Sequence, residues 1–302
     1  MLNIFLTVVL PIFLVAGAGA ALQRVRPGPL GLLAPASLYI FAPALALDGL
    51  LQTELPLDVS LRIVGAAATI LIAMVAVSWI VARVLRLDRT NESGFMLTGT
   101  FGNAGNMGIP VAFLAFGDDG LAVAIMVFIT QSSISWPIGI YIAARGRTRG
   151  WAPLLTAVKA PVLYVVPVAL VVRALDWTLP VTIERPIGLL ADAAIPGMLL
   201  VLGYQLALGI ALDRPGSIAA ALITRLVVGA AAGVGIATLF GLDGVVRNTV
   251  VLIAAMPAAV FITILATEYR TSPRFVATIV VASTIASLAT LTVIINLLER
   301  QA

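Results

Sequence analysis

The stretch from Thr98 to Val111 reads TGTFGNAGNMGIPV, and it places two asparagines, four glycines and a proline inside a long hydrophobic run. A helix in lipid satisfies its own backbone, because unpaired polar groups there are costly. Glycine and proline interrupt such a helix, and the amides of Asn103 and Asn106 lie where its backbone opens. A break of this kind is tolerated only where it is buried in protein or lines a wet cavity. The stretch therefore predicts a solute path through a membrane.

The composition is that of a membrane protein along the whole chain. Of the 302 residues, 61% are hydrophobic and 11% are charged. There is no cysteine and no histidine, which excludes disulfides, thiolate chemistry and imidazole metal ligands. The net charge of +4 comes from arginines at segment ends, which indicates orientation in a lipid bilayer rather than nucleic-acid binding. We expect neither a metal site nor a cofactor.

Long apolar runs recur along the sequence. A hydrocarbon core of about 30 Å needs about 20 helical residues. The first run is expected to stay in the mature protein, because Arg24 and Arg26 follow it, whereas a signal peptide begins with its positive residues. Ten spans are expected, at residues 2–22, 30–51, 60–84, 92–115, 120–144, 150–173, 184–210, 217–240, 247–269 and 275–298.

Arginines near segment ends are more frequent on the connections that follow odd-numbered spans, such as Arg83, Arg86 and Arg89, than on the other connections. Positive residues concentrate on the cytoplasmic side of a membrane. This asymmetry predicts a multi-pass protein of the cell membrane, inner or plasma, with both termini on the outer side.

Prolines recur at matching places in the two halves of the chain. Pro43 in the second span corresponds to Pro196 in the seventh, and Pro110 in the fourth span corresponds to Pro257 in the ninth. Matched spans are five apart, so the second half would enter the membrane in the opposite sense. Chance placement is the alternative, since proline is common in membrane spans.

We therefore expect an all-α membrane protein with ten transmembrane helices in a 5+5 inverted repeat. The first repeat covers residues 1–149 and the second covers residues 150–302, with the join near 145–150. In such architectures broken helices from the two repeats meet near the midplane and form the substrate site. Here these would be the fourth and ninth spans, crossing each other.

The breaks themselves predict an anion site. Proline is favourable at the first position of a helix, so Pro110 and Pro257 can each start the second half of a broken helix. A helix N-terminus presents free N–H groups and roughly half a positive charge. The amides of Asn103 and Asn106 can add donors for a carboxylate or acceptors for a cation. The alternative is a packing kink in which the asparagines bond neighbouring helices.

Further polar residues interrupt other apolar runs. The fifth span carries Thr130, Gln131, Ser132, Ser133 and Ser135, of which we expect Gln131 and one serine to reach a cavity. Gln205 could face it from the seventh span. Asp192 and Arg225 are candidates for ion coupling, and Arg225 could pair with Asp192 or attract substrate. The candidate substrate-binding residues are Asn103, Gly105, Asn106, Ile109, Pro110, Gln131, Gln205, Met256, Pro257 and Ala258.

The motif GNAGNMGIP ending at Pro110, the run AMPAAVFITILATEY ending at Tyr269 and the number of spans together resemble the auxin efflux carrier family, which is related to the bile acid:sodium symporters. The resemblance implies a transport domain of spans 3–5 and 8–10 and a scaffold of spans 1, 2, 6 and 7 that forms a homodimer. It also implies transport of organic anions by alternating access. The crossover asparagine of the plant carriers in this family, counted from the proline, falls on Asn103. Their long loop between the fifth and sixth spans is absent here and reduced to residues 145–150.

The expected function is that of a secondary carrier of small organic anions such as carboxylates, and not that of an enzyme. Efflux could be driven by the membrane potential, which contributes about 2.3 kcal/mol per charge for each 100 mV, or be coupled to H⁺ or Na⁺. Sodium-coupled uptake is the main alternative. An anion channel and an intramembrane enzyme are less favoured. Asp118 and Asp119 are similar to aspartyl-protease and prenyltransferase motifs only in part, since Ala115 stands where the protease motif needs glycine.

Overall fold

The structure is a computed structural model that describes residues 1–26, 33–52, 55–144, 162–175, 177–207 and 214–300. These residues are almost entirely helical and contain no strand, apart from one isolated β-bridge. Seven of the described helices are long and apolar enough to cross a membrane, and they cover Leu2–Val25, Leu33–Gln52, Leu57–Val84, Ala104–Ala144, Val181–Leu206, Pro215–Leu239 and Pro273–Glu299. The predicted class, an all-helical membrane protein, is confirmed.

Several of these long helices contain a π-helical segment, labelled η. The first part of the chain forms α1 (Leu2–Ile4), η1 (Phe5–Val9), α2 (Leu10–Val25), α3 (Leu33–Ala36), η2 (Ser37–Phe41), α4 (Ala42–Gln52), α5 (Leu57–Val84), α6 (Arg89–Thr100), η3 (Ala104–Gly108) and α7 (Ile109–Ala144). The second part forms α9 (Val162–Ala174), α10 (Val181–Asp192), α11 (Ala194–Leu206), α12 (Pro215–Leu222), η4 (Ile223–Val228), α13 (Gly229–Leu239), α14 (Gly244–Ala254), α15 (Phe261–Glu268) and α16 (Pro273–Glu299).

Two of the expected spans are broken rather than continuous. The fourth span is divided between α6 and the helix that begins with η3, and the ninth is divided into α14 and α15. Within α7, the backbone leaves helical geometry at Gly117, with φ 65° and ψ −152°, where the sequence predicts a turn between the fourth and fifth spans. The expected join at 145–150 and the first part of the sixth span lie outside the described residues. The count of ten and the 5+5 repeat therefore remain predictions.

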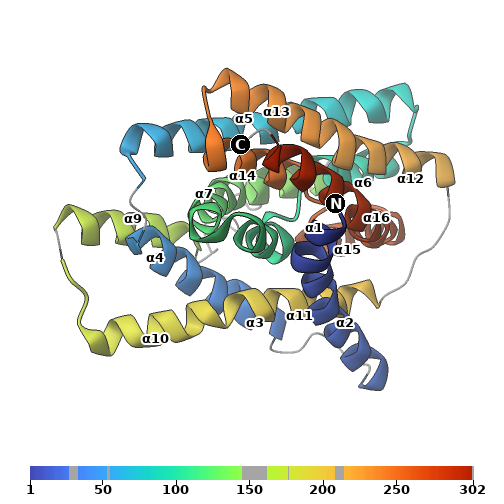
Figure 1. The fold of residues 1–302 in the computed structure, drawn as a ribbon. Helices are drawn as coiled ribbons and strands as arrows, with labels where there is room; N and C mark the ends of the chain where they lie inside the picture. Colours follow the sequence, from blue (N-terminus) through green and yellow to red (C-terminus); the bar gives the residue numbers. More distant parts are fainter. Residues whose placement is uncertain (27–32, 53–54, 145–161, 176, 208–213, 301–302) are drawn as a thin grey trace.

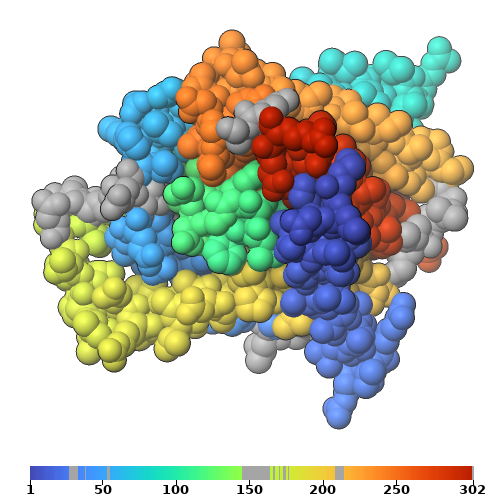
Figure 2. All heavy atoms as spheres, in the orientation of Figure 1, coloured from blue at the N-terminus to red at the C-terminus, as the bar shows by residue number. Residues whose placement is uncertain are grey.

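The helices form two groups with α7 between them (Figure 1). On one side, α5 packs against α6, α7 and α13, and α13 packs against α14. On the other side, α11 packs against α2, while α4 packs against α9 and α10. Figure 2 shows the exposed part of α7 framed by α2, α11 and α16. The N-terminal amino group of Met1 donates to Oδ1 of Asn296 at 3.4 Å, so the chain begins beside the end of α16.

Candidate functional site

The two breaks lie against each other and share their backbone hydrogen bonds. Gly102, between α6 and η3, forms an antiparallel β-bridge with Ala258, between α14 and α15. The N–H of Asn103 donates to the carbonyl oxygen of Pro257 at 2.8 Å, and the N–H of Ala259 donates to that of Phe101 at 2.8 Å. Each unwound segment thus supplies hydrogen-bond partners for backbone groups of the other. Open backbone is tolerated at membrane depth only where it has such partners. We call residues 101–103 and 255–260 the paired breaks.

Side chains from neighbouring helices hold the paired breaks from outside. Ser283 of α16 accepts a hydrogen bond from the N–H of Ala258 at 3.1 Å. On the other segment, the hydroxyl of Thr100 donates to the carbonyl oxygen of Met74 in α5 at 3.4 Å. The two unwound segments are therefore anchored to long continuous helices as well as to each other.

The expectation that Pro110 and Pro257 start the second half-helices is wrong. The first of these helices begins earlier, at Ala104 in η3, with Asn103 at its N-cap, so Pro110 lies inside a helix. The wider π-helical turn of η3 directly precedes Pro110, a residue that lacks an N–H. Pro257 remains in the unwound segment, because α15 begins only at Phe261.

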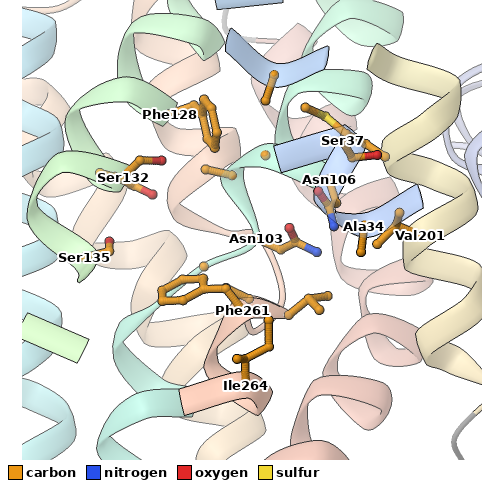
Figure 3. A pocket seen from close by; sticks show the side chains of 18 of the residues that line it. Ala34, Ser37, Asn103, Asn106, Phe128, Ser132, Ser135, Val201, Phe261 and Ile264 are labelled. Atoms are coloured by element: carbon orange, nitrogen blue, oxygen red, sulfur yellow. The ribbon is translucent and has the colours of Figure 1, made fainter. Parts of the chain in front are cut away.

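A cavity of about 140 Å³ opens beside the paired breaks. We call it the break cavity. The first break, η2, α7, α11 and the beginning of α15 all contribute to its wall (Figure 3). Of the predicted substrate-binding residues, it brings together Asn103, Gly105, Asn106, Gln131 and Gln205. The other predicted binding residues do not line it, and they are Ile109, Pro110, Met256, Pro257 and Ala258.

Three polar atoms at the break cavity are buried without a hydrogen-bond partner. They are Nδ2 of Asn103, Oγ of Ser37 in η2 and Oε1 of Gln205 in α11. Asn103 and Ser37 are each only 4% exposed. Although Asn103 occupies the N-cap position, its side chain makes no capping bond. Figure 3 shows its amide in the middle of the cavity, with Ser37 on one side and Ser135 on the other.

The polar run in α7 divides between the cavity and the helix backbone. The hydroxyls of Thr130 and Ser133 donate to the carbonyl oxygens of Met126 and Ile129, each at 2.8 Å. Gln131, Ser132 and Ser135 line the break cavity. Gln131 thus lies at the cavity, where the sequence analysis expects it, together with two serines instead of the one expected.

Aromatic rings form the apolar part of the cavity wall. The ring of Phe261 lies 5.5 Å from that of Phe101 and 5.3 Å from that of Trp136, measured between centroids. Phe128 of α7 packs against Gly105, where a Cβ atom would lie 2.8 Å from its ring. Gly105 therefore makes room for this ring at the cavity wall.

Asp192 and Arg225 are not brought together, so the expected pairing between them is wrong. Asp192 is exposed at the end of α10 and lines a separate cavity of about 780 Å³, together with Asp48 and Glu184. Arg225 is buried in η4, and its guanidinium group donates to backbone carbonyl oxygens. The two residues belong to different parts of the molecule.

Sequence reasoning missed several residues of the break cavity. Ser37 carried a usable signal, since it is a lone hydroxyl within the apolar run 30–51. Phe128, Trp136 and Phe261 carried none, because aromatic residues in an apolar span more often pack in the core.

Comparisons with known proteins show which family the chain belongs to. A family model described as "Membrane transport protein" matches residues 5–153 and, separately, residues 150–295. An uncharacterized transporter of Methanocaldococcus jannaschii is 27% identical over 212 residues, which is 68% of each chain. An uncharacterized transporter of Methanothermobacter thermautotrophicus is 28% identical over 218 residues, which is 71% of each chain. The chain thus belongs to the membrane transport protein family, the family of the auxin efflux carriers that its two motifs resemble.

Proposed function

We propose that this transporter is a secondary carrier of small organic anions, such as carboxylates, and that it binds them in the break cavity. The observation that carries the proposal is the convergence of three unpartnered buried polar atoms, on Asn103, Ser37 and Gln205, at one cavity. A buried polar group without a partner costs about 1–3 kcal/mol. A carboxylate that accepts hydrogen bonds from Nδ2 of Asn103 and Oγ of Ser37 recovers that cost at these two atoms, whereas Oε1 of Gln205 needs a donor, such as a hydroxyl group of the ligand.

The helix ends around the break cavity favour a negatively charged ligand. Asn103 to Asn106 and Val260 to Phe261 line it, and these residues begin the two helices that follow the breaks. Each helix N-terminus carries roughly half a positive charge. Among the described residues, no aspartate or glutamate lines the cavity to oppose an anion. The amides of Asn103, Asn106 and Gln131 add donors for carboxylate oxygens.

The cavity volume favours a small substrate. A cavity of roughly 150 Å³ holds a ligand the size of benzene. At about 140 Å³, the break cavity matches carboxylates of similar size. The rings of Phe128, Trp136 and Phe261 offer apolar contact to the carbon skeleton.

Efflux is the direction of transport that needs no coupling ion. An anion that leaves an inside-negative cell gains about 2.3 kcal/mol per charge for each 100 mV, whereas uptake requires a coupling cation. Coupling to H⁺ or Na⁺ belongs to the proposal as an alternative, with Asp192 as the candidate coupling residue. Sodium-coupled uptake is the alternative function.

We further propose that alternating access uses a 5+5 inverted repeat, with residues 1–149 and 150–302 as the two units. The separate matches of the family model to residues 5–153 and 150–295 support this division. The scaffold of spans 1, 2, 6 and 7, the homodimer it forms, the location in the cell membrane and the outer position of both termini belong to the same proposal.

The proposal is tested by a thermal-shift screen of the purified protein against small mono- and dicarboxylates. A ligand at about 100 times its Kd stabilises the folded state by about 2.7 kcal/mol, so binding raises the unfolding midpoint. We expect Asn103→Ala to reduce this rise to about half or less, because weaker binding leaves less stabilisation at the same ligand concentration. Thr249→Val is the matched control, because Oγ1 of Thr249 is also buried without a partner but does not line the break cavity. If no carboxylate stabilises the wild type, or if both variants respond like it, the proposal is wrong.

A further inference from the structure

Arg225 joins the ends of the two helices that lead into the paired breaks. Its Nη1 atom donates to the carbonyl oxygens of Gly99 at 3.3 Å and Thr100 at 2.8 Å, at the end of α6. Its Nη2 atom donates to the carbonyl oxygen of Ala254, the last residue of α14. Arg225 itself is only 2% exposed. One buried guanidinium group therefore bonds the C-terminal ends of both broken helices.

A cation is needed at this place for a physical reason. The last carbonyl groups of a helix have no partner within the helix, and they carry roughly half a negative charge. Here two such ends converge in the buried interior. In transporters with broken helices, half-helix C-terminal ends and unwound carbonyls are the groups that coordinate a transported sodium ion. In this chain a side chain supplies the positive charge.

The backbone around Arg225 is shaped to hold its guanidinium group. A Cβ atom on Gly229, one turn further along the same helix, would lie 2.6 Å from Nη2 of Arg225 and 2.8 Å from the carbonyl oxygen of Ala254. A Cβ atom on Gly102 would lie 3.5 Å from Cζ and Nη2. Glycine at position 229 therefore leaves the space that the guanidinium group fills, whereas a Cβ atom on Gly102 would only contact it.

Within the described part of the chain, the groups that balance the charge of Arg225 are these carbonyl oxygens. None of the ion pairs between described residues involves it. Gly102 also lines the break cavity, so the positive charge lies just behind the cavity wall. A fixed cation there attracts an anion without a second, dissociable ion.

We propose that Arg225 is the resident cation of the paired breaks and takes the place of a coupling sodium ion. The wild-type protein then binds its anion without a sodium requirement, a consequence that rests on the proposed function. The structural part of the proposal, a cation site formed by the helix ends, does not rest on it.

The structural part is tested with Arg225→Ala and guanidinium ion as the probe. We expect a lower thermal unfolding midpoint than in the wild type, and a saturable rise of that midpoint with millimolar guanidinium chloride. Arg62→Ala is the control, because exposed Arg62 also donates to a backbone carbonyl, that of Gly241 at 3.2 Å, but encloses no buried site. The proposal is overturned if the rise is absent in Arg225→Ala, or if Arg62→Ala or the wild type shows a rise of the same size.

A second pair of variants applies even where Arg225→Ala does not fold. Arg225→Lys keeps the charge, whereas Arg225→Met keeps an unbranched chain without it. We expect a larger monodisperse fraction and a higher unfolding midpoint for the lysine variant. If lysine is no better than methionine, the charge is not the property that matters and the proposal fails.

The sodium consequence is measured on the wild type alone. Coupled ligands change each other's affinity by about 5- to 150-fold. We expect the affinity for a stabilising carboxylate to change by less than about fivefold when choline replaces sodium, and a change of about fivefold or more would overturn the proposal. If no carboxylate binds under any condition, the proposed function fails, while the guanidinium titration still decides the role of Arg225.

Discussion

The N–H of Asn103 donates to the carbonyl oxygen of Pro257 at 2.8 Å, which joins two segments from opposite halves of the chain. Because this bond uses the backbone of Asn103, and its side chain does not cap the helix that follows, the amide is left for the break cavity. A change in either break therefore affects the other break and the break cavity beside them.

The sign of the ligand charge can be tested at Asn103. Asn103→Asp keeps the side-chain shape but replaces a donor with a negative charge. A hydrogen bond to a charged group contributes about 1.5–3 kcal/mol, so Asn103→Ala should weaken carboxylate binding about 10- to 100-fold. Asn103→Asp should weaken it further, because like charges repel. Titration calorimetry on both variants measures the ranking, and an aspartate variant that binds as well as the wild type would refute an anion site.

The two prolines should differ in effect because they differ in place. Pro257 keeps the second break unwound, so Pro257→Ala should extend α14, displace the carbonyl that pairs with Asn103 and slow transport by about tenfold or more, or about 1.4 kcal/mol in barrier. Pro110 lies inside a helix, where alanine restores an N–H, so Pro110→Ala should transport like the wild type. Flux into proteoliposomes compares them. Equal rates for the two variants would show that the second break does not depend on Pro257.

The breaks could be predicted because glycine, proline and asparagine within an apolar run leave little choice of local structure. Asn103, Gln131 and Gln205 were likewise found from their polarity in lipid. The prediction that Pro110 starts a helix was wrong because proline fits both at a helix start and after a wider π-helical turn. Which of the two occurs depends on the hydrogen bonds around Asn103. The exact start of such a helix depends on packing between segments that are distant in the sequence, and a local sequence pattern does not show that packing.

Arg225 illustrates the same limit. The sequence marks it as an unusual charge in an apolar span, and this was correct. Its partners are the carbonyl oxygens of Gly99, Thr100 and Ala254, and backbone carbonyls occur at every position. The sequence therefore suggested Asp192, an opposite charge at a similar depth in its span, which lies elsewhere.

Gly105 should determine which sizes of carboxylate the break cavity accepts. In Gly105→Ala, the new methyl group would lie 2.8 Å from the ring of Phe128 and push it into the break cavity. We expect weaker binding, with the bulkier carboxylates affected most, and a nearly unchanged fold. Gly17→Ala in α2 is the control, because nothing lies within 4 Å of its Cβ position. Thermal-shift titrations with carboxylates of increasing length measure the effect, and an unchanged size preference would contradict it.

Asp192→Asn tests the proposed coupling residue. Asp192 lies at the larger cavity and not at the paired breaks, so carboxylate affinity should stay the same. If Asp192 couples flux to protons, the variant should flatten the pH dependence of transport. Flux at a series of pH values measures this. An unchanged profile would remove Asp192 from the coupling mechanism while leaving the binding site intact.

Glycine at position 203 should be required for the close packing of α11 against α2. A Cβ atom there would lie 1.6 Å from the carbonyl oxygen of Ala16, and a backbone atom cannot swing aside as a side chain can. Gly203→Ala should therefore separate the two helices, at about 1–3 kcal/mol or more. Because Val201 and Gln205 of α11 line the break cavity, carboxylate affinity should fall as well.

Gly188→Ala in α10 is the matched control, because its Cβ position has nothing within 4 Å and alanine gains about 0.5–1 kcal/mol over glycine in a helix. Its unfolding midpoint should equal or exceed that of the wild type. Gly203→Ala should unfold at a lower temperature and bind more weakly. Should Gly203→Ala match Gly188→Ala in both measurements, α2 and α11 would not meet backbone to backbone, and the position of Gln205 in the cavity would need another cause.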